Sequence, residues 1–149
     1  MKRIPSLFLF LLFFAAACNQ ADKSASAGAE SDIDAARSFI RAALDGNFDK
    51  ARTYLLQDSM NNEYMNATER SYNKFAKDTA NQYRSASINI HNVQTVNDSV
   101  TVVTFSNSYR NDHQSVRVVK SGGNWLIDLK YLFIKPGAPA APGKIDSVQ

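Results

Sequence analysis

The sequence predicts an α+β domain in which N-terminal helices pack on one face of a four-stranded antiparallel sheet. Apolar residues recur at helical spacing through residues 31–83, and they alternate at strand spacing from residue 86 onward. Turn residues separate the alternating runs, so neighbouring strands should pair antiparallel. Helices that all precede a meander of strands are typical of α+β domains, whose sheet is covered on one face.

Capping residues bound the first two predicted helices. Ser31, with Asp34 three residues later, resembles a capping box that begins the first helix. Gly46 should end that helix by adopting a positive φ, and Asn47 should cap a second, short helix. The inner faces are expected to consist of apolar residues at three- and four-residue steps: Ile33, Ala36, Phe39, Ile40, Ala43 and Leu44, then Phe48, Ala51 and Leu55.

A third helical region is predicted to begin at Asp58 or Ser59, and Thr68 is expected to restart it. The residues that recur at helical spacing in its second part are Tyr72, Phe75, Ala76, Thr79 and Tyr83.

Four strands are predicted in the second half of the domain. The first ends at a turn at residues 97–98, the second spans residues 99–109, and the third spans residues 114–120. A glycine-containing hairpin loop at residues 121–124 leads into the fourth. The inner face of the sheet is expected to carry Ile88, Ile90, Phe105, Trp125, Ile127 and Leu129.

Strand alternation separates Asp128 from its neighbours in the fourth strand. Trp125 and Ile127 should be buried against the helices, whereas Asp128 should point away from them, toward solvent.

The chain begins with the three-part layout of a secretory signal. Lys2 and Arg3 precede an apolar run at residues 7–14, and three alanines then lead to Cys18. The apolar run is far shorter than the roughly 20 residues of a transmembrane helix. Residues 1–17 are therefore expected to be a signal peptide, and a permanent transmembrane anchor is not expected.

The small residues before Cys18 resemble the lipobox of bacterial lipoproteins, with Ala at position −3, where Leu is commonest. This resemblance implies cleavage before Cys18, a lipid on its thiol and attachment to a membrane. The alternative is an ordinary signal peptide cut near Ala17. Asn19 at position +2 is not the Asp that is linked to inner-membrane retention, so an outer-membrane lipoprotein facing the periplasm is expected, with surface exposure left open.

The mature chain divides into three parts. Residues 18–30 are rich in Ala and Ser and are expected to be a flexible tether. Residues 31–135 are expected to form the folded domain, and residues 136–149, which contain three prolines, are expected to be a disordered tail.

Two of the 17 basic residues lie in the signal peptide, so the net charge of +3 is partly due to the signal peptide. No basic stripe indicates nucleic-acid binding. Because Cys18 is the only cysteine, a lipidated chain has no disulfide and no thiolate metal site.

The predicted first helix, residues 36–44, leads into residues 45–51, which contain the step Gly46-Asn47-Phe48, and residues 123–128 (Gly-Asn-Trp-Leu-Ile-Asp) close the last hairpin. These two segments resemble the nuclear transport factor 2-like (cystatin-like) family, in particular small bacterial lipoproteins that carry such a domain of unknown function. In these families a helix ends in a Gly-Asp/Asn-aromatic step and enters a second helix, and the last hairpin ends in Gly-x-Trp-x-Ile. The resemblance spans about residues 31–132. It implies a curved, cone-like sheet wrapped around helices, often with a pocket between them. Such a fold hosts enzymes, binders and structural modules, so it does not fix function.

The sequence contains no glycine-rich phosphate loop, nucleophile elbow or zinc signature. His91, on the polar side of the first strand, and His113, in a turn, are expected to be solvated rather than metal ligands. Some enzymes of the resembled fold abstract a proton with an Asp or His inside the cone, and Asp128 is the candidate here. Its expected outward orientation argues against that role. No catalytic residue, metal or cofactor is therefore expected.

Seven aromatic residues lie where helices and sheet should meet, and they either line a pocket or fill the core. Core filling is favoured because large aromatic side chains dominate core burial, although tyrosine hydroxyls also suit a pocket rim. These residues are Tyr54, Tyr72, Phe75, Tyr83, Phe105, Tyr109 and Trp125.

Four Asp-(Ser/Thr)-aliphatic triplets resemble the acceptor motif of a periplasmic O-glycosylation system in some Gram-negative bacteria. The acceptor hydroxyls would belong to Ser59, Thr79, Ser99 and Ser147. Helix capping at residues 58–59 and a turn at residues 98–99 are the alternatives for two of them.

These features together predict a non-enzymatic envelope lipoprotein, held to the membrane through lipid on Cys18, whose domain binds a small apolar ligand or a protein partner. Two alternatives remain open. One is an isomerase- or dehydratase-like enzyme of the same fold, and the other is a structural or inhibitory module that acts through its sheet.

Overall fold

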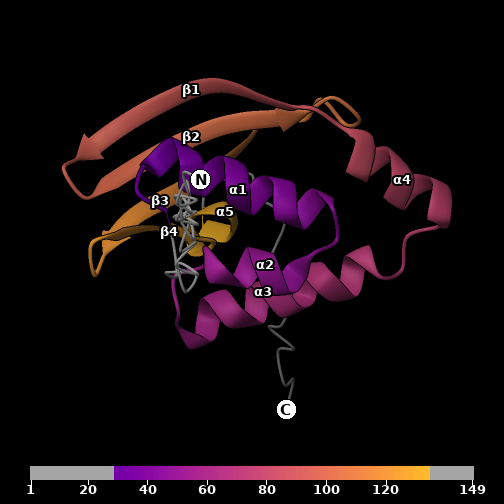
Figure 1. Cartoon of the computed structure of the whole chain (residues 1–149), viewed down its shortest axis with the longest axis horizontal. Helices are drawn as coiled ribbons and strands as arrows, with labels where there is room; N and C mark the ends of the chain where they lie inside the picture. The colour runs from indigo at the N-terminus through magenta and orange to yellow at the C-terminus, as the bar shows by residue number, and fades with distance from the viewer. Residues whose placement is uncertain (1–28, 135–149) are drawn as a thin grey trace, which may run out of the picture.

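The computed structural model describes residues 29–134. The predicted signal peptide, Cys18, most of the tether, the tail and Ser147 lie outside these residues. The domain is α+β, with N-terminal helices packed on a four-stranded antiparallel open sheet (Figure 1). Within the described part of the chain, no helix is long and apolar enough to span a bilayer.

Four helices precede the sheet and a fifth follows it. They are α1 (Asp32–Leu44), α2 (Phe48–Thr53), α3 (Ser59–Tyr72), α4 (Lys77–Ser85) and α5 (Lys130–Ile134). The strands β1 (Ile88–Asn97), β2 (Val100–Asn107), β3 (Gln114–Ser121) and β4 (Asn124–Asp128) pair in the order β1-β2-β3-β4. Figure 1 shows α1 lying along the sheet, α2 and α3 beyond it, and α4 at one end of the molecule.

The predicted caps of the first three helices are confirmed. Ser31 Oγ accepts the backbone N–H of Asp34 at 3.2 Å, and its hydroxyl donates to the Asp34 carboxylate at 2.7 Å. Asn47 caps α2 by accepting the backbone N–H of Lys50 at 3.0 Å. Asp58 is the N-cap of α3. These bonds satisfy the free N–H groups of each first turn, which is why the sequence marks the starts so clearly.

Gly46 has a φ of +73°, as its place after α1 predicts. A Cβ at this position would lie 2.6 Å from Cε1 of Tyr72, so a side chain here would displace Tyr72 and would also be strained by the backbone conformation.

The predicted helix restart at Thr68 is wrong. The hydroxyl of Thr68 donates to the Tyr64 carbonyl at 2.9 Å, so it is satisfied inside α3 instead of capping a new helix. The break occurs later, after Tyr72, and α4 starts beyond Ala76, whose backbone is extended. Phe75 consequently lies between the helices and is 39% exposed, not on a buried helical face.

The sheet follows the predicted meander, with turns where they were expected. Gly122 and Gly123 join β3 to β4 with φ values of +58° and +86°, which suits a two-residue hairpin with a primed turn. The register of β1 against β2 shifts at His91 and at Val96, so β1 carries two irregularities. The free side of β4 is bridged by Ala29 at Trp125 and by Leu55 at Ile127, whereas β1 is an edge strand.

The core lies between α1, α2, α3 and the sheet. Its buried members include Phe39, Ile40, Leu55, Met65, Val103, Phe105, Val116, Val118 and Ile127. Ile33 was expected in this core but is 36% exposed. In the first turn of α1, Asp32 is the residue that contacts the sheet, since its carboxylate accepts the Thr101 hydroxyl at 2.7 Å.

Two expectations for the fourth strand need correction. β4 ends at Asp128, so Leu129 and Lys130 are not strand residues. Asp128 is not directed to solvent: it is only 5% exposed, because Arg117 lies opposite it on β3 and Lys130 approaches its other oxygen. Trp125 is only half-buried, packs against the edge of the core, and has the Lys120 ammonium 5.7 Å from its ring centroid.

Candidate functional site

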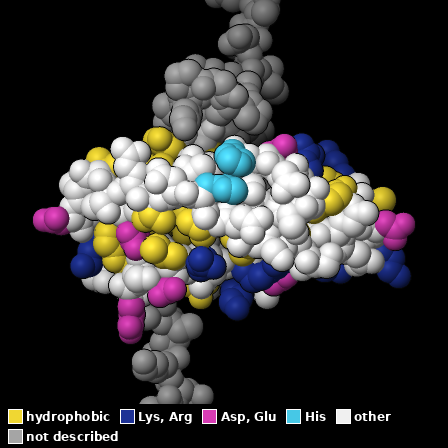
Figure 2. Space-filling model, turned by 90° about the horizontal axis from the view of Figure 1, so that it is seen from above, with side chains coloured by type: hydrophobic (Ala, Val, Ile, Leu, Met, Phe, Trp, Pro, Cys, Tyr) yellow, Lys and Arg dark blue, Asp and Glu magenta, His cyan; other side chains and the backbone are white. Residues whose placement is uncertain are grey.

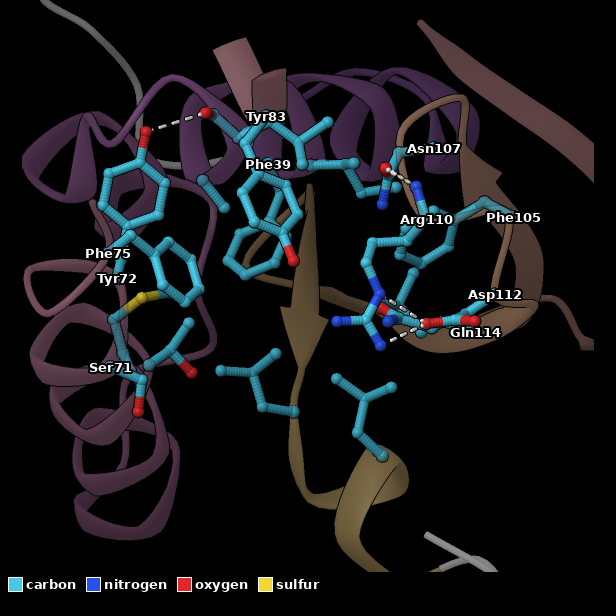
Figure 3. A pocket seen from close by; sticks show the side chains of 18 residues that line it. Phe39, Ser71, Tyr72, Phe75, Tyr83, Phe105, Asn107, Arg110, Asp112 and Gln114 are labelled. Atoms are coloured by element: carbon cyan, nitrogen blue, oxygen red, sulfur yellow. Dashed lines mark hydrogen bonds and ion pairs between the residues drawn. The ribbon is translucent and has the colours of Figure 1, made fainter. Parts of the chain in front are cut away.

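A cavity of about 370 Å³ lies between the helices and the sheet. Its walls come from α1, α3, α4, α5 and strands β2 and β3, together with the loop that joins those two strands. The inner wall is apolar, and six of its members are buried core residues: Phe39, Ile40, Met65, Phe105, Val116 and Leu129. Figure 3 shows the helical side, with Ser71 and Tyr72, facing a polar edge that carries Asn107, Arg110, Asp112 and Gln114.

Stacked aromatic rings form the helical end of the cavity. The ring of Tyr72 meets Phe75 at 5.5 Å and Tyr83 at 6.4 Å between centroids, and its hydroxyl donates to the Leu44 carbonyl at 3.2 Å. Phe75 stacks on Tyr83 at 5.2 Å, and Tyr109 packs edge-on against Tyr83 at 4.9 Å. These contacts link α3, α4 and the β2–β3 loop into one wall.

Of the seven aromatic residues singled out in the sequence, four line the cavity and three lie outside its lining. Tyr72, Phe75, Tyr83 and Phe105 line the cavity, and of the seven only Phe105 is fully buried. Tyr109 supports Tyr83 from outside the lining, and Tyr54 and Trp125 pack at the margin of the core.

Arg41 positions Tyr83, although nothing in the sequence marked it. Its guanidinium donates to the carbonyls of Ala86 at 2.7 Å, Arg84 at 2.9 Å and Tyr83 at 3.3 Å. The C-terminal carbonyls of a helix need such partners, and α1 thereby holds the end of α4 beside the cavity.

The polar edge of the cavity is a loop that is held by hydrogen bonds of its own side chains. Asn107 is buried, and its Oδ1 accepts the backbone N–H groups of Tyr109 at 3.2 Å and Arg110 at 3.0 Å. Nε of Arg110 donates to Oδ2 of Asp112 at 3.0 Å, and Nη2 forms an ion pair with the same oxygen at 2.9 Å. This carboxylate, helped by Tyr83, raises the pKa of Arg110 above its ordinary value. The sequence indicated only a solvated turn here, because the cavity beside it depends on the tertiary fold.

A second polar cluster anchors the wall that Leu129 contributes. Asp58 accepts bonds from the backbone and the side chain of Asn61, each at 2.8 Å, and from the Lys130 ammonium at 2.5 Å. The bond from Lys130 lowers the pKa of Asp58, and the bond to Asp58 raises the pKa of Lys130. Asp128, the catalytic candidate considered from sequence, is 3.5 Å from Lys130 in this cluster and does not line the cavity.

The two histidines lie together, which the sequence did not indicate. The rings of His91 and His113 stack with centroids 4.0 Å apart, and His91 Nε2 lies 2.8 Å from Ser106 Oγ (Figure 2). Both residues are exposed. Ser106 alternates with the cavity-lining Phe105 along β2, so the pair occupies the other face of the sheet. Stacked rings do not direct their lone pairs at one ion, and residues 29–134 contain no group of three or more potential His, Cys, Asp or Glu ligands.

Three of the four acceptor triplets lie in the described residues. Ser59 is exposed at the start of α3, and Ser99 is exposed in the β1–β2 turn, where its N–H donates to Asn97. Thr79 is half-buried in α4. Ser59 and Ser99 therefore present their side chains to solvent on the described surface, and Thr79 does so only in part.

Comparison of the chain with protein-family models, with curated proteins and with solved structures finds no match.

Proposed function

We propose that this protein is a non-enzymatic binding module of the cell envelope and that its cavity takes a small apolar ligand. The observation that carries this proposal is the division of the cavity into a buried apolar wall and one narrow polar edge. Small-molecule sites are mostly apolar with a few convergent polar groups, and the 370 Å³ volume falls in their usual range of about 300–1,000 Å³.

The cavity chemistry favours binding over an isomerase or dehydratase activity. Proton abstraction needs a titratable group in an enclosed, water-poor place. The carboxylate that lines this cavity, Asp112, is half-exposed and forms an ion pair with Arg110. Asp128 forms ion pairs with Arg117 and Lys130 and does not line the cavity.

The proposal includes the finer fold assignment and the location. Helices that join at residues 46–48, a meander ending at residues 123–127 and a cavity between the two layers support a nuclear transport factor 2-like domain. The signal and Cys18 support a lipid-anchored protein of the outer membrane that faces the periplasm. Metabolic labelling with an alkyne fatty acid tests the anchor: label on the wild type and none on Cys18→Ser is expected, and label that persists on the variant contradicts it.

A neutral fluorescent probe such as N-phenyl-naphthylamine tests the cavity itself. The full mature chain, with Cys18→Ser and an ordinary signal peptide, should bind the probe at one saturable site. Ala43→Phe places a ring in the cavity from α1 and should weaken binding at least about tenfold, which corresponds to roughly 1.4 kcal/mol. Ala67→Phe, on α3 outside the lining, is the matched control. Equal binding by the wild type and Ala43→Phe contradicts the proposal.

The β1 edge supports a second candidate, contact with a second copy of the chain through the sheet. β1 contains no Asp, Glu, Lys or Arg, and Val93 and Val96 are 36% and 56% exposed on it. Edge strands are usually protected by charge, and two uncharged β1 strands can pair without bringing like charges together. Sedimentation should detect a dimer that Val96→Lys disrupts. A chain that stays monomeric at all concentrations contradicts this candidate.

A further inference from the structure

We propose that the cavity binds a single-chain amphiphile with an anionic head group, its head at Arg110 and its chain along the apolar wall. This inference rests on the proposed function and specifies the ligand class.

The charges at the cavity are confined to one edge. Among the described lining residues, Arg110 is the one cation and Asp112 the one anion, and both belong to the β2–β3 loop. The opposite side is formed by the rings of Tyr72, Phe75 and Tyr83 and by the apolar side chains of α1 and α3. A ligand that matches this surface carries its polar group at one end and an apolar chain behind it, because a polar group in the apolar wall would lose its hydrogen bonds to water.

The geometry of Arg110 leaves room for a second anion. A guanidinium offers five N–H donors; Asp112 engages Nε and Nη2 through the single oxygen Oδ2, and the Tyr83 side chain also interacts with the guanidinium. In Figure 3, a terminal nitrogen of Arg110 points into the space that the lining residues surround. Asp112 therefore holds the guanidinium in the way a ligand carboxylate or phosphate would, and its negative charge opposes a second anion at the remaining donors.

Asn107 adds a second donor to the same edge. Its Oδ1 is occupied by two backbone N–H groups of the loop, which fixes the orientation of the amide. The amide group that remains for the cavity is the Nδ2 donor, and Figure 3 shows the side chain of Asn107 beside the loop that carries Arg110. Two donors on the same edge of the cavity favour an anion, whereas a cationic head would meet the permanently charged Arg110.

A carboxylate and a phosphate head group share this chemistry, so the experiment includes both. The full mature chain with Cys18→Ser is titrated below micelle-forming concentrations with dodecanoate, dodecyl phosphate, dodecanol and dodecyltrimethylammonium, each displacing the neutral fluorescent probe. At least one anion is expected to bind ten times more tightly than dodecanol, and the cation more weakly than dodecanol. Preference for dodecanoate or for dodecyl phosphate distinguishes a free fatty acid from a phospholipid-derived ligand.

Two substitutions at the same ion pair should move the anion affinity in opposite directions. Arg110→Gln should lower it to about that of dodecanol, whereas Asp112→Asn should raise it severalfold by removing the opposing negative charge. Arg37→Gln, an equal change of charge on the exposed face of α1, should change neither. Because Arg110 and Asp112 are both more than half exposed, the variants should keep the wild-type melting temperature.

The outcomes separate the two proposals. Equal affinity for dodecanol and both anions, or an anion affinity that Arg110→Gln leaves unchanged, overturns the head-group assignment while chain binding in the cavity stands. Failure of the wild type to bind any of the four probes overturns the proposed function and this inference together.

Discussion

The side-chain oxygen of Asn61 accepts the backbone N–H of Leu129 at 2.8 Å, across 68 residues of chain. Asn61 is fully buried, and its Nδ2 donates to Asp58 at 2.8 Å. One amide therefore joins the start of α3 to the residue that links β4 to α5, and it fixes the cavity wall at Leu129. Both polar atoms of this buried amide therefore have a hydrogen-bond partner, as buried polar groups usually do.

Asn61→Leu should destabilise the domain by about 1–3 kcal/mol, since it leaves the buried N–H of Leu129 without a partner. Thermal unfolding followed by circular dichroism measures the loss. Asn62→Leu, at the next position of α3 and only half-buried, is the control and should have little effect. Equal melting temperatures for Asn61→Leu and the wild type would show that the link between α3 and Leu129 contributes nothing to stability.

Gly46→Ala should cost more than Gly122→Ala, although both glycines have positive φ. An alanine in this conformation costs about 1–2 kcal/mol at either site. Only at Gly46 would the new methyl group also meet another residue, since Tyr72 Cε1 lies 2.6 Å away, whereas nothing lies within 4 Å of a Cβ at Gly122. Urea unfolding of both variants measures the difference. A larger loss at Gly122 would contradict the packing of Tyr72 against the end of α1.

The ion pair between Asp58 and Lys130 should make stability depend on pH in acid. Because Lys130 lowers the pKa of Asp58 below its ordinary value of 3.8, the folded state favours the ionised carboxylate. This contribution is present above that ordinary value and disappears as the pH falls through the lowered one. Asp58→Asn keeps a good N-cap while removing the charge. Urea midpoints from pH 7 to pH 2 should show the variant less stable at neutral pH, with the difference vanishing in acid; a constant difference would contradict the account.

Ile127→Ala should destabilise the domain more than Trp125→Ala, despite the larger side chain of tryptophan. Ile127 is fully buried, so its truncation leaves a cavity and should cost about 2–5 kcal/mol. Trp125 is half-buried at the edge of β4, where Lys120 and water can partly fill the space it leaves. Equilibrium unfolding of the two variants decides the order. The reverse order would mean that Trp125 is a central core residue, as the strand pattern alone suggests.

Local signals in the sequence were sufficient for much of the fold. Ser31, Gly46, Asn47 and Asp58 mark helix ends because each acts on backbone groups within a few residues of itself. The paired glycines at residues 122–123 likewise define the hairpin between β3 and β4 without help from the rest of the chain. Thr68 was misleading for the same reason, since a threonine can cap a helix or bond within one.

The polar edge of the cavity could not be predicted from the sequence, because the role of its residues depends on contacts with elements that are distant in the chain. Asn107, Arg110 and Asp112 have the composition of an ordinary turn, and only the packing of α3 and α4 against β2 and β3 turns that loop into a cavity edge. Strand alternation likewise could not predict that Arg117 and Lys130 bury Asp128, because alternation gives the face on which a side chain lies and not the residues that cover it.

Native mass spectrometry of the protein purified from its own envelope tests the central claim most directly, because it asks whether the cavity is used in the cell. The account predicts a population of the wild-type chain that carries one additional small molecule, absent from Ala43→Phe and retained by Ala67→Phe. A bound mass that persists in Ala43→Phe, or a wild-type chain that carries no ligand and takes up none of the amphiphile probes, would contradict it.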